Sequence, residues 1–185
     1  MKADIIFDHL GSTLSKKAVE ELAKMVVINQ FSIKDLVNLT FHKDEKIGFR
    51  ASWILETLYI NDTEYFAKEA CYFLNRFGDQ NNLSSRRHFG KILALMTAKN
   101  APKGIKDLII NTDTEAHVET VFNWLIDEHV PVAIKSHCLN ILANLCLKHS
   151  WIKDELRDTM DFLVDKESIA FFAKVKQIRK QLAKT

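Results

Sequence analysis

The sequence predicts an all-α fold in which antiparallel helix hairpins stack on one another. Apolar residues recur every three or four positions along almost the whole chain, which is the period of a helix with one buried face. The 185 residues include only 5 glycines and 2 prolines, too few for the many tight turns of a β-sandwich or barrel. An Ile-Leu pair also returns three times, as Ile54-Leu55, Ile92-Leu93 and Ile141-Leu142.

The spacing of the Ile-Leu pairs indicates the kind of stack. The separations are 92 − 54 = 38 and 141 − 92 = 49 residues, which bracket the repeat of about 40–47 residues typical of HEAT and armadillo units. A basic or imidazole side chain stands four residues before each isoleucine: Arg50, His88 and His137. We therefore expect a HEAT/armadillo-like α-solenoid that forms one domain over residues 1–185. An irregular helical bundle is the alternative.

Helix-start signals divide the chain into elements. Serine and aspartate are expected at the helix starts, because their side-chain oxygens accept hydrogen bonds from the free amides of the first turn. Gly78 is expected to end a helix in the left-handed conformation, and Pro131 suits a first turn because it has no N–H. Start signals are assigned to Ser15, Ser32, Asp44, Asp62 and the Ser84-Ser85 pair. The expected helices cover residues 15–30, 33–42, 45–60, 63–77, 85–99, a short segment ending at 110, 115–128, 131–148, 151–164 and 168–183.

Successive helices are expected to pair as hairpins, and the second helix of each is called a B helix below. The three B helices cover 45–60, 85–99 and 131–148, and each carries one Ile-Leu pair. A single hairpin cannot bury both of its faces, so stacking of neighbours is needed to form a core. The C-terminal helix has lysines and arginines between its apolar positions, and we expect it to cap the stack.

The overall composition excludes few classes of function. The net charge of +2 is only weakly favourable for a nucleic-acid partner. Cys71, Cys138 and Cys146 form no paired motif and are expected to be buried, in a reducing compartment. The N-terminus lacks the apolar run of a signal peptide, and no apolar stretch approaches the roughly 18 residues of a membrane span. These features predict a cytoplasmic protein without membrane contact.

The candidate functional site is a polar stripe along the B helices. It comprises Arg50 and Trp53 on the first, Arg87, His88 and Lys91 on the second, and His137, Asn140, Asn144 and Lys148 on the third. In stacked HEAT units the B helices line the concave surface, so the stripe predicts a shallow, mildly basic groove. Arginine and lysine would bind phosphates or carboxylates there, and Trp53 would offer a flat apolar platform. The competing interpretation is that every exposed helix needs a polar stripe and that Trp53 only fills a junction between hairpins.

Three segments carry a resemblance to a known family. They are Lys46–Glu56 (KIGFRASWILE), Phe122–Ile126 (FNWLI) and the run from Val132 through Leu156 that contains HSWIKDEL. In their order they resemble a family of small HEAT-like proteins of Bacteroidetes-type bacteria. The resemblance spans residues 30–183 and implies a helical-repeat fold, with no established function to assign to particular residues. Members sometimes carry the label adenylosuccinate lyase, but the Ser-rich catalytic loop of true lyases is missing around Ser84-Ser85.

No catalytic constellation emerges from the sequence, so we expect a protein that is not an enzyme. There is no HExxH motif, no nucleophile elbow and no Gly-rich phosphate loop, and we expect no metal and no cofactor. The predicted function is a protein-interaction or scaffold module that holds a protein or acidic peptide. The alternative is a DNA-binding or DNA-repair protein related to HEAT-like alkylpurine DNA glycosylases. Acidic Glu56 or Asp127 among the cations would favour a protein partner, whereas clustered cations would favour nucleic acid.

Overall fold

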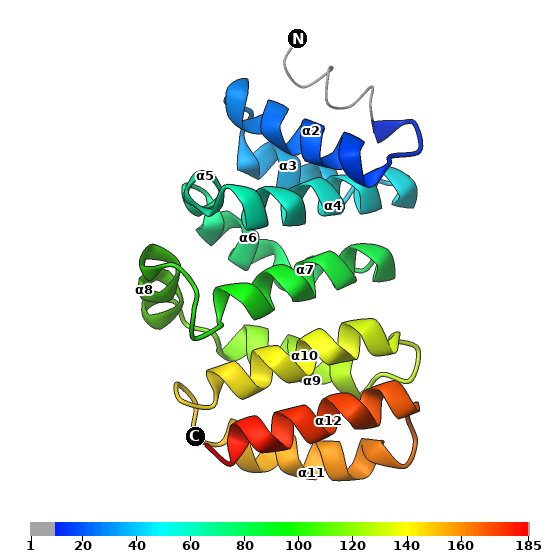
Figure 1. Cartoon of the computed structure of the whole chain (residues 1–185), viewed down its shortest axis with the longest axis vertical. Helices are drawn as coiled ribbons and strands as arrows, with labels where there is room; N and C mark the ends of the chain where they lie inside the picture. The colour runs from blue at the N-terminus through cyan, green and yellow to red at the C-terminus, as the bar shows by residue number, and fades with distance from the viewer. Residues whose placement is uncertain (1–9, 185) are drawn as a thin grey trace. The chain divides into compact units, whose positions relative to one another are not determined.

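The computed structural model describes residues 10–184, and within that part every regular element is helical, as predicted (Figure 1). The elements are α2 (Lys16–Ile28), α3 (Ile33–Leu39), α4 (Glu45–Asn61), α5 (Thr63–Ala67), α6 (Ala70–Arg76), the 3₁₀ turn η1 (Phe77–Asp79), α7 (Leu83–Met96), α8 (Lys103–Asn111), α9 (Glu115–Ile126), α10 (Val132–Leu145), α11 (Ile152–Val164) and α12 (Ile169–Leu182). We predicted that the N-terminus is not a signal peptide. Residues 1–9 lie outside the described part of the chain, so this stays a prediction. Among the described residues, no helix has both the length and the apolar character needed to span a membrane.

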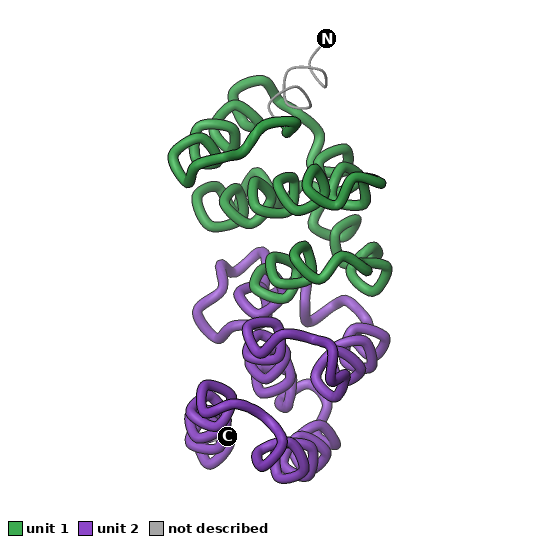
Figure 2. The backbone as a smooth tube through the Cα atoms, turned by 90° about the vertical axis from the view of Figure 1, so that its right-hand side faces the viewer, with its two compact units in different colours: residues 1–92 green, residues 93–185 purple. Residues whose placement is uncertain are grey.

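The chain forms two compact units, Met1–Ile92 and Leu93–Thr185, and the boundary falls within α7 (Figure 2). Unit 1 holds α2 to α6, η1 and most of α7, and unit 2 holds the last turn of α7 and α8 to α12. That residues 1–185 form a single domain stays a prediction.

In unit 1, the B helix α4 is covered on two sides. It packs against α2 and α3, and α3 and α6 form a layer behind α4 and α7 (Figure 1). Phe73 of α6 meets Phe89 of α7 with ring centroids 4.9 Å apart, which joins the second hairpin. The predicted pairing of the first two hairpins is therefore confirmed.

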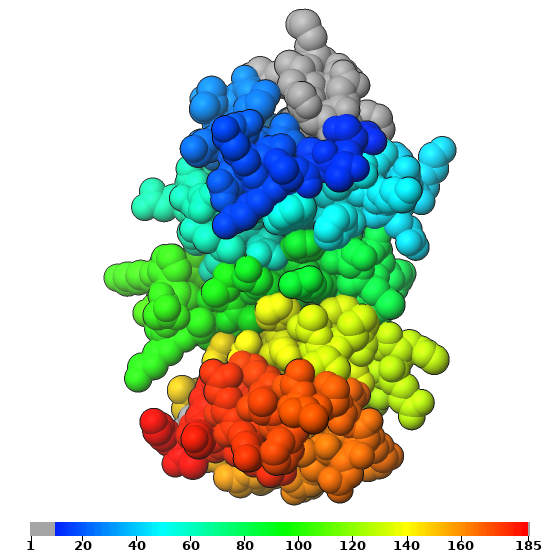
Figure 3. Space-filling view, turned by 45° about the vertical axis from the view of Figure 1, so that its right-hand side comes forward, coloured from blue at the N-terminus to red at the C-terminus, as the bar shows by residue number. Residues whose placement is uncertain are grey.

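In unit 2, the B helix α10 is again the central element. It packs against α9, α11 and α12. Helix α12 lies alongside α10, with α9 and α11 in the layer behind, and the surfaces of α10 and α12 are adjacent in the space-filling view (Figures 1 and 3). Helix α12 buries an apolar stripe at helical spacing, formed by Phe171, Val175, Ile178 and Leu182. Its basic residues lie on the remaining faces, as expected of an amphipathic terminal helix.

The recurring Ile-Leu pairs belong to the buried core. All six side chains have no exposed surface. Because the two residues are adjacent, their side chains point about 100° apart, and burial of both requires that the helix be covered over a wide part of its surface. Full burial of each contributes about 1.5–3 kcal/mol.

The expected helix starts are confirmed at the first four positions. The side chains of Ser15, Ser32, Asp44 and Asp62 accept hydrogen bonds from amides of α2, α3, α4 and α5. The assignment of Ser84-Ser85 as the start of the next B helix is wrong, because Asn82 Oδ1 accepts from the amides of Ser84 and Ser85 at 2.9 and 3.2 Å. The asparagine places the start at Leu83.

Several expected helices end at other residues than predicted, and two of these ends differ in their geometry. The segment 63–77 is divided into α5 and α6, and Gly78 lies in η1 without a left-handed φ. A 3₁₀ turn ends this hairpin helix, so the glycine's left-handed conformation is not used. Gln30 adopts the left-handed conformation instead, with φ of 53°. It ends α2 through bonds from Gln30 N to Val27 O at 3.1 Å and from Phe31 N to Val26 O at 2.9 Å.

The expectation that the cysteines are buried holds for two of the three. Cys138 and Cys146 are buried, whereas Cys71 is exposed. Helix α6 buries Ala70, Phe73 and Leu74. Position 71 is rotated by about 100° from Ala70, and this turns the Cys71 side chain to solvent.

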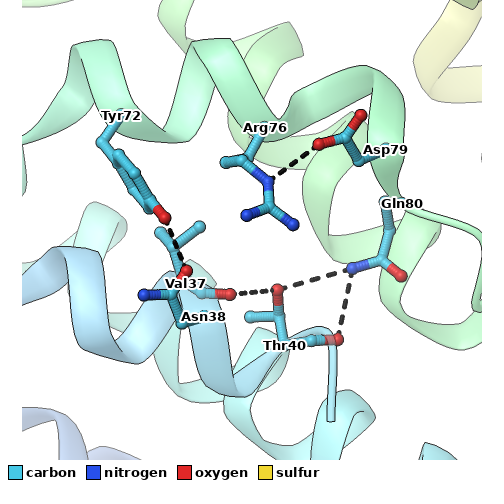
Figure 4. A network of polar contacts seen from close by, with 7 residues as sticks. All are labelled: Val37, Asn38, Thr40, Tyr72, Arg76, Asp79 and Gln80. Carbon is cyan, nitrogen blue, oxygen red and sulfur yellow. Dashed lines mark hydrogen bonds and ion pairs between the residues drawn. The ribbon is translucent and has the colours of Figure 1, made fainter. Parts of the chain in front are cut away.

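Polar contacts join the first hairpin of unit 1 to the second (Figure 4). Gln80 Nε2 donates to the carbonyl oxygen of Thr40 at 3.3 Å, and Tyr72 Oη donates to Asn38 Oδ1 at 2.6 Å. Gly48 of α4 faces the same Thr40 carbonyl, and a Cβ atom at position 48 would lie 2.7 Å from that oxygen. Only a glycine allows the end of α3 to approach α4 this closely.

Substitution of Gly48 tests this close approach. We expect Gly48→Ala to lower the free energy of unfolding by about 1–3 kcal/mol, because the clash is with backbone that cannot move without displacing α3. Urea denaturation followed by circular dichroism measures the change. Gly104→Ala in α8 is the matched control, since a Cβ atom there meets nothing within 4 Å; it should leave stability unchanged or raise it by up to about 1 kcal/mol. Equal effects of the two substitutions would contradict the packing described.

Candidate binding surfaces

Helices α4 and α7 bring five of the predicted stripe residues together in unit 1. Arg50 and Trp53 lie three residues apart on α4, and Arg87, His88 and Lys91 lie within two turns of α7. Glu56 completes this group, because it follows Trp53 by three residues and so lies on the same side of α4. These six residues are called the α4–α7 surface below.

Glu56 joins α4 to α7 through both of its carboxylate oxygens. His88 Nδ1 lies 2.6 Å from Oε2, and Lys91 Nζ donates to Oε1 at 2.6 Å. The Glu56 and His88 side chains are only 11% and 10% exposed, whereas that of Lys91 is 41% exposed. A largely buried carboxylate with two such partners is held in one position, and charge-assisted bonds of this kind are the stronger hydrogen bonds in proteins.

These contacts set the protonation of Glu56. Burial alone would raise the pKa of its carboxyl group, but the hydrogen bonds and electrostatic interactions with His88 and Lys91 outweigh burial and lower the pKa from its ordinary value of 4.5. Glu56 is therefore ionised at neutral pH, and its charge offsets that of Lys91.

Aromatic side chains lie beside this group. The ring of Phe49 lies 5.4 Å from that of His88 and 6.0 Å from that of Trp53, centroid to centroid. Phe49 and Trp53 are both half-buried. Part of each ring thus remains accessible next to the paired charges.

The two arginines of the α4–α7 surface differ in their freedom. Arg50 Nη1 donates to the carbonyl oxygen of Leu10 at 2.6 Å, which fixes the guanidinium against the chain. Arg87 is exposed.

The stripe residues of unit 2 lie on α10 and just beyond it. His137, Asn140 and Asn144 are half-buried on α10. Asn144 Nδ2 donates to Ala94 O at 3.2 Å and to Thr97 Oγ1 at 3.3 Å, and its Oδ1 accepts from Gln181 Nε2 at 3.0 Å. The amide of Asn144 therefore connects the end of α7 to α12 through α10.

Lys148 holds the end of α8. Helix α10 ends at Leu145, three residues before its expected end, so Lys148 lies beyond it. Its Nζ donates to the carbonyl oxygens of Ile109 at 2.7 Å, Ile110 at 3.0 Å and Thr112. An ammonium group has three N–H donors, and all three are used on carbonyls that a helix C-terminus leaves unpaired. The positive charge also complements the negative end of the helix dipole.

A pocket of about 980 Å³ opens in unit 2 between α8 and the C-terminal ends of α7, α10 and α12. It is called the α8–α10 pocket below. Its lining is mostly apolar, and its cations are Lys99, Lys106, Lys148 and Lys184. No carboxylate occurs among the described residues that line it. The sequence prediction included Asn144 and Lys148 but missed the rest of this site.

The described residues show no cluster of metal-binding side chains. In residues 10–184, no three histidine, cysteine or acidic side chains are grouped closely enough to hold a metal ion.

The fold places this chain in the class of helical-repeat proteins. The sequence matches the HEAT repeat domain family over residues 6–184, and the chain therefore belongs to that family. A crystal structure of an engineered protein from the Northeast Structural Genomics Consortium superposes with a TM-score of 0.62 at 14% identity, covering 96% of this chain and 79% of that one. At this identity the likeness shows the fold alone. No curated protein matches the sequence.

The lowered pKa of Glu56 predicts a pH dependence of stability. The stabilisation from a carboxylate whose folded pKa is lowered is complete above its unfolded pKa, here about 4.5, and is lost as the pH falls through the folded pKa. We expect Glu56→Gln to lower the free energy of unfolding by about 1–2 kcal/mol at pH 7. The difference from wild type should shrink below about pH 4.5. Urea denaturation between pH 7 and pH 3 measures it, with the exposed Glu119→Gln as control; a difference independent of pH would refute the pairing.

Loss of Lys148 should loosen α8. We expect Lys148→Met to weaken the end of α8 by about 1 kcal/mol, which corresponds to about fivefold faster opening-limited cleavage. Limited trypsin digestion with mass-spectrometric mapping of cuts after Lys103 and Lys106 measures this rate. Lys24→Met, which removes an exposed lysine from α2, is the control. Unchanged cleavage of α8 in Lys148→Met would show that these hydrogen bonds do not hold the helix.

Proposed function

We propose that this HEAT repeat protein is a non-enzymatic, cytoplasmic interaction module that holds a protein segment against its B helices. HEAT repeat proteins are generally non-catalytic and commonly mediate protein interactions. In unit 1 the contact surface would be the α4–α7 surface. The observation that carries the proposal is the pairing of Glu56 with His88 and Lys91.

This pairing supports a protein partner over nucleic acid. A surface that binds phosphates gains affinity from cations without fixed internal partners, because each neutralised phosphate releases counterions. On the α4–α7 surface, Lys91 already contacts a carboxylate and Arg50 a carbonyl group. The α4–α7 surface therefore has less charge to offer a polyanion than the sequence suggested.

The side chains that remain accessible suit a protein interface. Trp53 is half-buried and Arg87 is exposed. Tryptophan and arginine are enriched among the residues that dominate protein–protein binding energies, because both bury a large area and offer directed polar contacts. A partner segment would place apolar groups on Trp53 and an acidic or carbonyl group on Arg87.

Peptide selection on the full chain tests this proposal. Phage-displayed 12-residue peptides are selected on the wild-type protein, and enriched sequences are measured by fluorescence anisotropy. We expect Trp53→Ala and Arg87→Glu each to weaken the selected peptides about tenfold, the typical cost of losing one central interface residue. Lys24→Glu, an exposed change of charge on α2, should leave binding unchanged. Because Arg87 is exposed, Arg87→Glu is expected to fold, which circular dichroism verifies.

A DNA duplex and a single strand are measured in parallel at about 50 and about 200 mM salt. If Trp53→Ala and Arg87→Glu both leave peptide affinity unchanged, the proposed surface is wrong. Steeply salt-dependent DNA binding that Arg87→Glu abolishes would overturn the protein partner in favour of a DNA-binding protein.

A further inference from the structure

We propose that the α8–α10 pocket of unit 2 binds a peptide segment that carries one large apolar side chain flanked by carboxylates. The inference rests on the proposed interaction function, to which it adds a second site and the chemistry of the partner. Three observations carry it: the charge of the lining, its exposed apolar side chains and the state of its polar groups.

The charged side chains among the described lining residues of the pocket are all positive. Lys99, Lys106 and Lys184 are exposed lining residues, and none of them takes part in an ion pair within the described part of the chain. Lys148 adds a fourth positive charge, although its N–H donors are used on α8. Like charges around one concavity repel each other, and a bound anion relieves this repulsion.

The walls expose large apolar side chains to solvent. Leu147 is 82% exposed and Ile110 is 66% exposed, and both line the pocket beside buried Ile109 and Met96. Isolated exposed apolar residues are common, but two that face one concavity with an apolar floor form a contact surface for another apolar group. An apolar side chain placed between α8 and the end of α10 would cover both.

The polar groups inside the pocket are already partnered. Both N–H groups of Asn144 are donated, to Ala94 O and Thr97 Oγ1, and its oxygen accepts from Gln181. Thr97, which follows α7, in turn donates its hydroxyl to Leu93 O in the last turn of that helix at 2.9 Å. The interior therefore favours an apolar group, and the lysines at the ends of separate elements supply the polar contacts.

The placement of the lysines favours a peptide over a small molecule with one carboxylate. Lys99 follows α7, Lys106 lies on α8, and Lys184 follows α12. A single carboxylate would leave most of these charges unmatched, whereas acidic residues on both sides of an apolar side chain can meet several of them. A pocket of about 980 Å³ also exceeds the volume of one side chain, so flanking backbone can enter.

The probe is a fluorescein-labelled peptide of sequence EEDFDEE, measured by anisotropy against the full chain at about 50 and about 200 mM salt. Control peptides are EEDGDEE, which lacks the apolar side chain, and KKSFSKK, which reverses the charge. We expect EEDFDEE to bind, EEDGDEE to bind at least about fivefold more weakly, and KKSFSKK not to bind.

Matched substitutions locate the peptide. Lys106→Glu and Lys184→Glu are expected to weaken EEDFDEE about tenfold, and Ile110→Ser and Leu147→Ser about fivefold. All four side chains are exposed, so the variants should fold. The controls are Lys24→Glu and Ile28→Ser on α2, which make the same changes at exposed positions of unit 1.

Each outcome decides between the two proposals. Loss of EEDFDEE binding in the pocket variants alone supports this inference. No binding at low salt, or equal weakening by the α2 controls, overturns it, and peptide binding through Trp53 and Arg87 would still stand. Loss of binding only in Trp53→Ala and Arg87→Glu places the peptide on the α4–α7 surface and overturns the pocket. Dodecanoate binding that the pocket variants abolish, without EEDFDEE binding, would assign the pocket to a small amphipathic anion instead.

Discussion

The structure depends on the burial of the B helices α4 and α10 from more than one side. Helix α4 is covered by α2 and α3, and α10 by α9, α11 and α12. A helix packed in this way keeps only a narrow strip of its surface for polar residues. A buried polar group on that strip that lacked a hydrogen bond would cost about 1–3 kcal/mol. The fold therefore requires partners for the buried members of the polar stripe.

The two units meet this requirement with different chemistry. In unit 1 a carboxylate on α4 accepts bonds from a histidine and a lysine on α7. In unit 2 the amide of Asn144 joins the end of α7 to α12, and Lys148 completes the C-terminus of α8. The stripe thus has a structural role first. The groups that remain accessible, an arginine and a tryptophan in unit 1 and the lysines and exposed aliphatic side chains around the pocket in unit 2, are the basis of the proposed interactions.

Local rules predicted much of the fold. The Ile-Leu pairs located the B helices, and Ser15, Ser32 and Asp44 marked helix starts. Both signals depend only on residues that are close together in the chain. The predictions were wrong where a different residue or a different turn could form the same local hydrogen bonds. Asn82 accepts the bonds assigned to the serines that follow it, and a 3₁₀ turn replaces the left-handed end expected at Gly78.

The candidate sites were predicted less completely, since they depend on tertiary contacts. The sequence showed that Glu56 could lie among the cations, but not that it would contact both His88 and Lys91, 32 and 35 residues away. Lys148 was expected to face a ligand, and its bonds to α8 depend on where that helix packs. The pocket combines the ends of four helices, and its apolar walls gave no signal beyond single hydrophobic residues such as Ile110 and Leu147 at helix ends.

Native-state hydrogen exchange, followed residue by residue by NMR, tests the central claim most directly. If burial of the B helices holds the structure together, the slowest-exchanging amides should lie around Ile54-Leu55, Ile92-Leu93 and Ile141-Leu142, and those of α5 and α8 should exchange faster. Slowest exchange in α3, α9 or α11, or equal protection of all helices, would contradict the account.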